Sequence, residues 1–230
     1  GIRLWCAGAV GTEPVLAEAT DASTSSSTST TDGAVPTLPN GEPVPGLSPD
    51  GPWTLVDGAP GVEDPGFVYE LLPKLWVFLP TEESDDDGNL FVPSPADIPI
   101  IEAYLRATVT YFEAVTSDPI DLDSAGWANH FADEGASYFD VLRAKREAGH
   151  VVDMDLGVVL RPHVIGDLRT DSYAVVFDCV LDGSVFRLPT GVLAPGSSFG
   201  VGDSPVSAPV RLTETGWLVD YISAQPNACV

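Results

Sequence analysis

Three histidines and the carboxylates near them are the residues of this chain whose types could support acid–base chemistry. His130, His150 and His163 are 20 and 13 residues apart, so they lack the H-x-x-H and H-E-x-x-H spacings of zinc sites. If the fold encloses an apolar pocket, His163 could form a general acid–base pair with Asp155 or Asp178. The alternative is that His163 is a solvated residue near the end of a strand.

The acidic string EESDDDGN at residues 82–89 contains the candidate metal ligands Asp85, Asp87 and Asn89. Their oxygen atoms suit Ca²⁺, but the spacing departs from the D-x-D-x-D-G loop and the distal Glu is lacking. A solvated acidic turn is the alternative. The chain also has no G-x-S-x-G motif, and GSSFGVGDSP at 196–205 does not open a helix as a phosphate-binding loop does. The sequence therefore specifies no cofactor.

The stretch YAVVFDCVLDGS at residues 173–184 places Cys179 inside a predicted strand, and Cys229 follows the last predicted strand. A buried cysteine can simply be a small hydrophobic residue. The position of Cys229 at the chain end instead favours a Cys179–Cys229 disulfide that pins the tail to the sheet. Such a bridge closes a loop of about 50 residues, worth about 4 kcal/mol in the chain-entropy model. It requires an oxidising compartment, which indicates an exported protein of the cell envelope or exterior.

The composition is strongly acidic, with 34 Asp and Glu against 10 Lys and Arg and a net charge of −24. A surface of this charge repels phosphate backbones, so nucleic acids are excluded as partners. Anionic membranes are disfavoured for the same reason. No run approaches the roughly 18 apolar residues that span a bilayer, so no transmembrane segment is predicted. The 44% hydrophobic content is enough for a folded core.

Residues 1–52 are predicted to be a flexible tether, beginning with GIRLWCAGAVGTEP and continuing through Ser/Thr-rich and then Pro/Gly-rich sequence. Ala7-Gly8-Ala9 fits the small-x-small pattern of signal-peptide cleavage. Cys6 is a candidate for lipidation, although Trp5 and Arg3 stand where a lipoprotein signal has small and aliphatic residues. A third alternative is that these first residues lie outside the natural chain.

Residues 53–95 are predicted to be an extended apolar segment, because FVYELLPKLWVFLP is broken by prolines at positions 73 and 80. The segment could pack on the main domain, which the sequence favours, or dock on a separate partner. The residues that would make the docking contacts are Phe67, Tyr69, Leu75, Trp76 and Phe78.

Residues 96–230 are predicted to form an α+β domain. Apolar residues at three- and four-residue steps indicate a helix from Asp97 to the Asp118-Pro119 pair, and further helices are expected near 125–131 and 134–148. After Gly149 the period changes to two, which predicts a strand over 152–160. Four or five antiparallel strands are predicted from this point on, with a hairpin turn at Asp182-Gly183 and a last strand after Thr215-Gly216.

The strings IPIIEAYLRATVTYFEAV, LRAKREAGH, VVLRPHVI, YAVVFDCVLDGS and TETGWLVDYI occur in this order over residues 97–225. In order and content they resemble the nuclear transport factor 2-like (cystatin-like) domains of actinobacterial lipoproteins and secreted proteins. The resemblance implies a curved antiparallel sheet that wraps a helix into a cone. The same cone serves cyclases, ketosteroid isomerases and many non-catalytic modules, so the resemblance does not fix an activity.

These observations together favour an exported, envelope-associated module that binds or scaffolds without catalysis, its partner being an envelope or membrane-complex protein or an apolar small ligand. Two alternatives remain at this point. One is a small-molecule isomerase or cyclase that uses a pocket in the cone. The other is an accessory subunit of a larger envelope complex, which would place residues 53–92 on a neighbouring protein.

Overall fold

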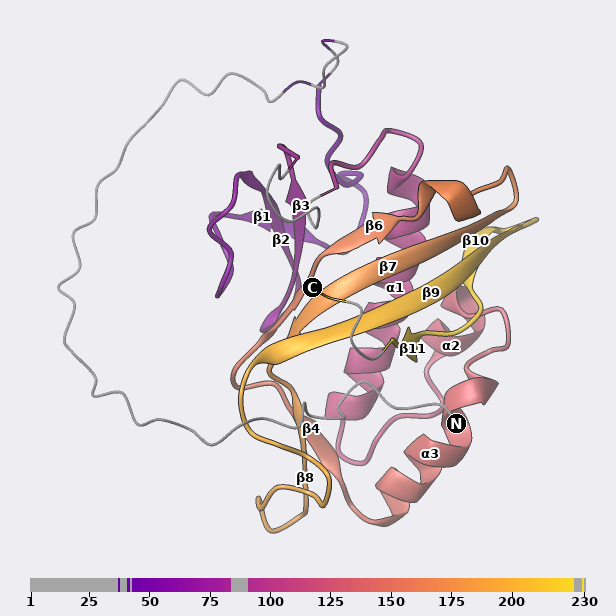
Figure 1. Cartoon of the computed structure of the whole chain (residues 1–230). Coiled ribbons are helices and arrows are strands. Elements are labelled where there is room, and N and C mark those ends of the chain that lie inside the picture. The colour runs from indigo at the N-terminus through magenta and orange to yellow at the C-terminus, as the bar shows by residue number, and fades with distance from the viewer. Residues whose placement is uncertain (1–36, 38–40, 42, 84–90, 226–228, 230) are drawn as a thin grey trace, which may run out of the picture.

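The computed structural model describes residues 37, 41, 43–83, 91–225 and 229. In these residues the chain forms a nine-stranded sheet, a separate two-stranded ribbon and three α-helices (Figure 1). The predicted α+β class is therefore confirmed. The helices are α1 (Ile98–Thr116), α2 (Ala125–His130) and α3 (Ala136–Glu147), and a short 3₁₀ turn, η1, spans Gly166–Leu168. The strands are β1 (Thr54–Val56), β2 (Gly66–Leu72), β3 (Leu75–Pro80), β4 (Val151–Asp153), β5 (Val158–Leu160), β6 (Pro162–Val164), β7 (Tyr173–Asp182), β8 (Val185–Arg187), β9 (Gly202–Thr213), β10 (Gly216–Val219) and β11 (Ser223–Ala224).

The large sheet is mixed, whereas the sequence predicts an antiparallel one. Its strand order is β1-β2-β3-β5-β7-β9-β10, with β6 also pairing β7 and β11 also pairing β9. The parallel pair is β3 with β5, in register from Leu75 opposite Val158. All three helices lie between these two strands in the sequence, and a connection of that length is what parallel pairing requires.

Helix α1 is the centre of the hydrophobic core. It crosses behind the long strands β7 and β9 (Figure 1), and 13 of its 19 residues are buried. The prediction of an amphipathic helix therefore understates its burial, because α1 is covered by the sheet on one side and by other segments elsewhere. Around α1 the core contains a cluster of aromatic rings in contact with one another, namely Tyr111, Phe112, Trp127, Phe131, Tyr138 and Phe139.

The apolar segment before α1 belongs to the same sheet. Strands β2 and β3 form a hairpin whose inward residues Leu71, Leu75, Val77 and Leu79 join the core around α1. Pro73 lies in the turn of this hairpin, where its missing amide is tolerated. Of the two placements that the sequence leaves open, the structure shows the described residues 53–83 packed on their own domain.

The packed domain also begins earlier than residue 53. Val44 and Leu47 are buried, and the backbone amide of Leu47 donates to the Tyr69 hydroxyl over 3.2 Å. The amide of Ser48 donates to Glu102 of α1 over 2.6 Å. Residues 43–52, which the sequence assigns to the flexible tether, therefore cover part of α1; most of residues 1–42 lie outside the described residues.

Two predicted strand features differ in the structure. The alternating run 152–160 is one strand in the prediction but is divided between β4 and β5 by a turn in which Gly157 has φ +79°. The Asp182-Gly183 pair does not fold β8 back onto β7; β8 instead pairs with β4. The carboxylate of Asp182 accepts hydrogen bonds from the Ser184 amide and hydroxyl, which turns the chain away. The strand predicted after Thr215-Gly216 corresponds to β10, which pairs antiparallel with β9 across a turn at Glu214-Thr215.

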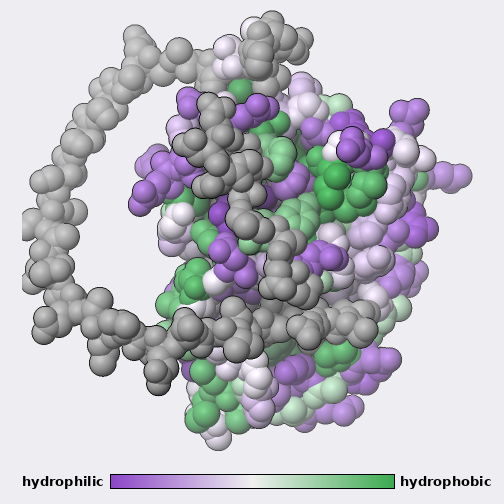
Figure 2. Space-filling view, in the orientation of Figure 1, coloured by the Kyte–Doolittle hydropathy of each residue, from purple (hydrophilic) through white to green (hydrophobic). Residues whose placement is uncertain are grey.

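Figure 2 shows hydrophilic side chains over much of the visible face, with separate hydrophobic groups among them, one at the upper right and another at the bottom, where the loop between β8 and β9 lies. On this loop Val192, Phe199 and Val201 are each more than half exposed. None of the helices in the described ranges combines the length and apolar character needed to cross a membrane.

Candidate functional site

The most unusual polar group in the core is the carboxylate of Asp178 on β7. Side chains alternate along a strand, and Asp178 falls on the inward face with the buried residues Ala174, Val176 and Val180. The Tyr104 hydroxyl of α1 donates to Asp178 Oδ2 over 2.9 Å. Both side chains have 0% exposure. The pair therefore connects helix and sheet in the interior of the domain.

The second oxygen of Asp178 is used by the backbone. Between β5 and β6 the pairing with β7 is interrupted, and at this point the Arg161 amide donates to Asp178 Oδ1 over 2.7 Å. Without the carboxylate this amide would lie against the sheet with no partner, at a cost of about 1–3 kcal/mol. The local role of Asp178 is thus to satisfy one backbone donor and one buried phenol.

Burial controls the protonation of this site. It raises the pKa of Asp178 to about 7, opposed by the hydrogen bonds from Arg161 and Tyr104 and by the Arg161 charge. Burial, reinforced by the neighbouring Asp178 carboxylate, also raises the pKa of Tyr104 well above its ordinary value. At neutral pH the site therefore holds a neutral phenol and a carboxyl group that can lose or gain a proton.

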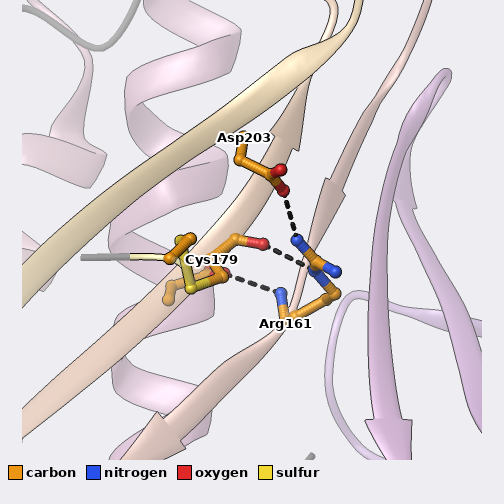
Figure 3. The surroundings of a disulfide bond; sticks show 5 residues. Arg161, Cys179 and Asp203 are labelled. Atoms are coloured by element: carbon orange, nitrogen blue, oxygen red, sulfur yellow. Dashed lines mark hydrogen bonds and ion pairs between the residues drawn. A yellow bond between two sulfur atoms is a disulfide. The ribbon is translucent and has the colours of Figure 1, made fainter. Parts of the chain in front are cut away.

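Arg161 links this buried site to the outer face of the sheet (Figure 3). Its Nε donates to the Cys179 carbonyl over 2.6 Å, and its Nη2 contacts Asp203 of β9 at 2.8 Å. Because Asp178 and Cys179 are consecutive, one points inward to Tyr104 and the other outward. Arg161 therefore contacts two consecutive residues of β7, through the Asp178 side chain and the Cys179 backbone carbonyl.

Cys179 forms a disulfide with Cys229, as the sequence predicts. The Cα atoms are 5.7 Å apart, within the usual range for this bond. The approach to Cys229 is also held by hydrogen bonds, because the Gln225 amide donates to the Pro205 carbonyl over 2.7 Å and its side chain donates to Ser207 over 2.7 Å. The end of the chain is thus attached to β7 covalently and to β9 by hydrogen bonds.

The structure does not bring His163 together with either proposed carboxylate. His163 pairs with Phe177 across β6 and β7 and stacks on Phe91, with ring centroids 4.3 Å apart. It therefore faces outward, opposite to Asp178. Burial lowers the pKa of His163 to about 4, so the ring is neutral at neutral pH. Asp155 lies exposed in the turn after β4 and forms an ion pair with Lys74.

The other candidate residues are distributed as follows. Tyr69, Leu75 and Phe78 are buried within their own domain, and Phe67 and Trp76 are half-buried against its hydrophobic clusters. They therefore do not form a free docking surface. Cys6, Asp85, Asp87 and Asn89 lie outside the described residues. Within the described ranges, no three His, Cys, Asp or Glu side chains are arranged to hold a metal ion.

A cavity of about 580 Å³ lies at the C-terminal end of α1. The residues around it belong to the β2–β3 turn, the last turn of α1, the α1–α2 connection and the turn after β4. They are Leu72, Pro73, Glu113, Ala114, Thr116, Ser117, Asp121, Ser124 and Met154. No sequence motif marks this site, because its walls come from four separate segments of the chain. The Asp118-Pro119 pair, which ends the apolar pattern of α1, is the one predicted feature that lies between lining residues of the cavity, Ser117 and Asp121.

Comparisons with protein families, curated proteins and solved structures found no match for this chain.

Proposed function

We propose that this protein is an exported, envelope-associated binding or scaffolding module that performs no catalysis. The observation that carries the proposal is the complete burial and hydrogen bonding of the Asp178 carboxyl group. It is the carboxyl group best suited to acid–base chemistry, yet it is fully buried and both of its oxygens accept hydrogen bonds within the domain. A general base must reach its substrate within hydrogen-bond distance, and a group in this position serves the fold instead.

The proposal includes a nuclear transport factor 2-like cone as the architecture. Support comes from a long helix buried against a sheet that contains two strands of ten and twelve residues, β7 and β9. The parallel β3–β5 pair and the hairpin before α1 depart from the simple antiparallel cone. In this proposal they extend one edge of the cone, and large aromatic side chains fill its interior.

Export is supported by the disulfide between Cys179 and Cys229, since such bonds persist in oxidising compartments.

A binding role is supported by the charge and the exposed apolar residues of the surface. The acidic excess of the chain and the exposed apolar side chains Val192, Phe199 and Val201 are features that a partner can recognise. The proposed partner is a protein of the envelope or of a membrane complex.

A second candidate function, a small-molecule isomerase or cyclase, is favoured by one observation. The pKa of Asp178 lies near 7 and a tyrosine hydroxyl touches it, as suits an acid–base pair. For this function the core would have to open to admit substrate between α1 and β7. Asp178→Asn distinguishes the two functions, because its amide oxygen can accept from the Arg161 amide and its NH2 group can donate to the Tyr104 oxygen, but it cannot act as a base.

The test is gentle purification of the tagged full-length chain under oxidising conditions, followed by mass spectrometry of the co-eluting proteins. The proposal predicts a stoichiometric envelope protein that co-elutes equally with the parent and with Asp178→Asn. A parent that elutes alone from both membranes and medium contradicts the proposal. The intact mass of the purified chain also reports the state of Cys6 and of the Cys179–Cys229 bond.

A further inference from the structure

The cavity at the C-terminal end of α1 combines apolar walls with an anionic rim. Leu72, Pro73, Ala114 and Met154 supply hydrocarbon surface, and Glu113 and Asp121 supply carboxylates. Its volume of about 580 Å³ is within the range of small-ligand pockets, roughly 300–1,000 Å³. The cavity can therefore accept a group that has both a hydrocarbon stem and a charge.

The end of α1 adds a second source of negative potential. The last carbonyls of a helix carry a partial negative charge, which a basic residue in the last turn usually offsets. Helix α1 has 19 residues and no basic residue in its last turn. The hydroxyls of Thr116 and Ser117 donate to the carbonyls of Phe112 and Glu113 instead. The negative end of the helix is thus left without a cation of its own.

The described cations are already engaged elsewhere. Eight are in ion pairs with carboxylates, and Lys145 lies over the ring of Phe186 at 4.6 Å. Lys74, which follows the lining residue Pro73, pairs with Asp155, and Arg146 pairs with Asp123, which lies between the lining residues Asp121 and Ser124 in the sequence. The lining carboxylates of Glu113 and Asp121 form no ion pair with a described residue. Asp121 instead accepts a hydrogen bond from the Asp123 amide over 2.8 Å, which fixes its position.

We propose that this cavity binds an ammonium group on an aliphatic stem, presented as a lysine side chain by a partner protein. The hydrocarbon walls would contact the methylene groups, and the carboxylates and hydroxyls of the rim would accept the three N–H bonds. Dispersed single acceptors suit a compact ammonium better than the planar fork of arginine. This inference rests on the proposed binding function, for which it supplies the site and the chemistry.

Met154 provides a direct reporter, because it is the only methionine of the sequence and lines the cavity. The full-length chain is labelled at the methionine methyl group and titrated at low salt with acetyl-Gly-Leu-Lys-Leu-Gly-amide. A Met154→Leu variant assigns the signal. The proposal predicts a saturable shift of this signal, reduced at high salt, and no shift with the same peptide carrying Nε-acetyl-lysine. An unmoved signal, or equal shifts with both peptides, overturns it.

Variants separate the site from the general acidity of the chain. Glu113→Gln with Asp121→Asn is expected to weaken binding of the lysine peptide at least about tenfold, and Thr116→Trp is expected to block it. The matched control is Glu214→Gln with Asp167→Asn, which removes the same charge from exposed positions and should change the affinity less than about twofold. Equal weakening by both pairs overturns the assignment. Binding of hexylammonium without binding of the peptide overturns the partner lysine in favour of a free amine.

Failure of this inference can be told from failure of the proposed function. A stoichiometric protein that co-elutes equally with the parent and with Glu113→Gln/Asp121→Asn leaves the binding function intact and overturns the cavity as its site. A protein that co-elutes with the parent but is lost from this pair, and kept by the control pair, supports both.

Discussion

Tyr104 and Asp178 form a hydrogen bond of 2.9 Å between the middle of α1 and the inward face of β7, with neither side chain exposed to solvent. The bond joins the central helix α1 to β7, one of the two long strands of the sheet. Since Arg161 uses the other carboxylate oxygen, one buried acid connects three segments that are far apart in sequence. Its protonation should therefore be visible in the stability of the whole domain.

Replacement of Asp178 by Asn should change how stability depends on pH. The folded-state pKa of Asp178 is raised from 3.8 to about 7, so the folded protein binds more protons than the unfolded chain between these values. The free energy of unfolding should thus fall as pH rises from about 4 to 7, by at most about 4 kcal/mol from this residue. Asp178→Asn should remove that loss, so that its stability relative to the parent increases with pH. Urea unfolding at several pH values measures the free energy of unfolding of the variant relative to the parent. A difference that stays constant with pH would contradict the raised pKa of Asp178. The control is Asp167→Asn, at an exposed position.

Replacement of Tyr104 by Phe should leave Asp178 Oδ2 without its donor. The loss is expected to be about 1–3 kcal/mol at pH 8, where the carboxylate is charged, and smaller at pH 5, where it is protonated. A double-mutant cycle with Asp178→Asn measures the coupling of the two side chains. Coupling near zero at both pH values would show that the bond does not stabilise the fold.

Loss of the disulfide should destabilise the domain by up to about 4 kcal/mol, because the bridge closes a loop between positions separated by 50 residues. In a Cys6→Ser background, Cys179→Ser and Cys229→Ser should each lower the melting temperature. Reductant should lower that of the parent and leave the variants unchanged. Equal melting of the parent with and without reductant would show that the bond contributes nothing to stability.

Truncation of Leu75 tests whether the hairpin before α1 is part of the core. Leu75 has 0% exposure on β3, so Leu75→Ala should cost about 2–5 kcal/mol. Leu55 on β1 is 60% exposed and serves as the control, with an expected effect within about 0.5 kcal/mol. Small and equal effects at the two positions would indicate that β2 and β3 do not pack on this domain in solution.

His163 should oppose folding at acid pH. Its pKa is lowered to about 4 by burial, so the unfolded chain binds the extra proton between about 6.5 and 4, and stability is lost as pH falls through this range. His163→Phe keeps a ring between Phe91 and Phe177 and removes the titration. Its stability relative to the parent should be about 1–2 kcal/mol greater at pH 4.5 than at pH 7.5, after allowance for partial exposure. An unchanged difference between these pH values would contradict the lowered pKa.

The elements with a clear period or a chemical constraint could be predicted from the sequence. The helix expected from Asp97 was found at Ile98–Thr116, since its apolar residues and the Asp118-Pro119 stop are local signals. The disulfide followed from the positions of two cysteines. The division of 152–160 into two strands could not be predicted, because Gly157 and its turn interrupt an alternation that continues in the sequence.

The inward position of Asp178 also could not be predicted from the sequence. Residues on both faces of YAVVFDCVL are apolar, and the prediction grouped Cys179 with Tyr173 and Val175 without showing which face the helix covers. In the structure the face that contains Asp178 is buried, and Tyr104 and the Arg161 amide supply hydrogen-bond partners for its carboxylate. These partners come from distant segments, so tertiary structure decides the face. The cavity at the end of α1 was missed for the same reason.

The measurement that tests the central claim most directly is the gentle purification of the parent and of Asp178→Asn under oxidising conditions, with mass spectrometry of what co-elutes. A binding module that performs no catalysis should retain the same stoichiometric envelope partner in both forms. A chain that elutes alone in both forms, and whose turnover of a small molecule is lost in Asp178→Asn, would contradict the claim and identify the buried carboxylate as catalytic.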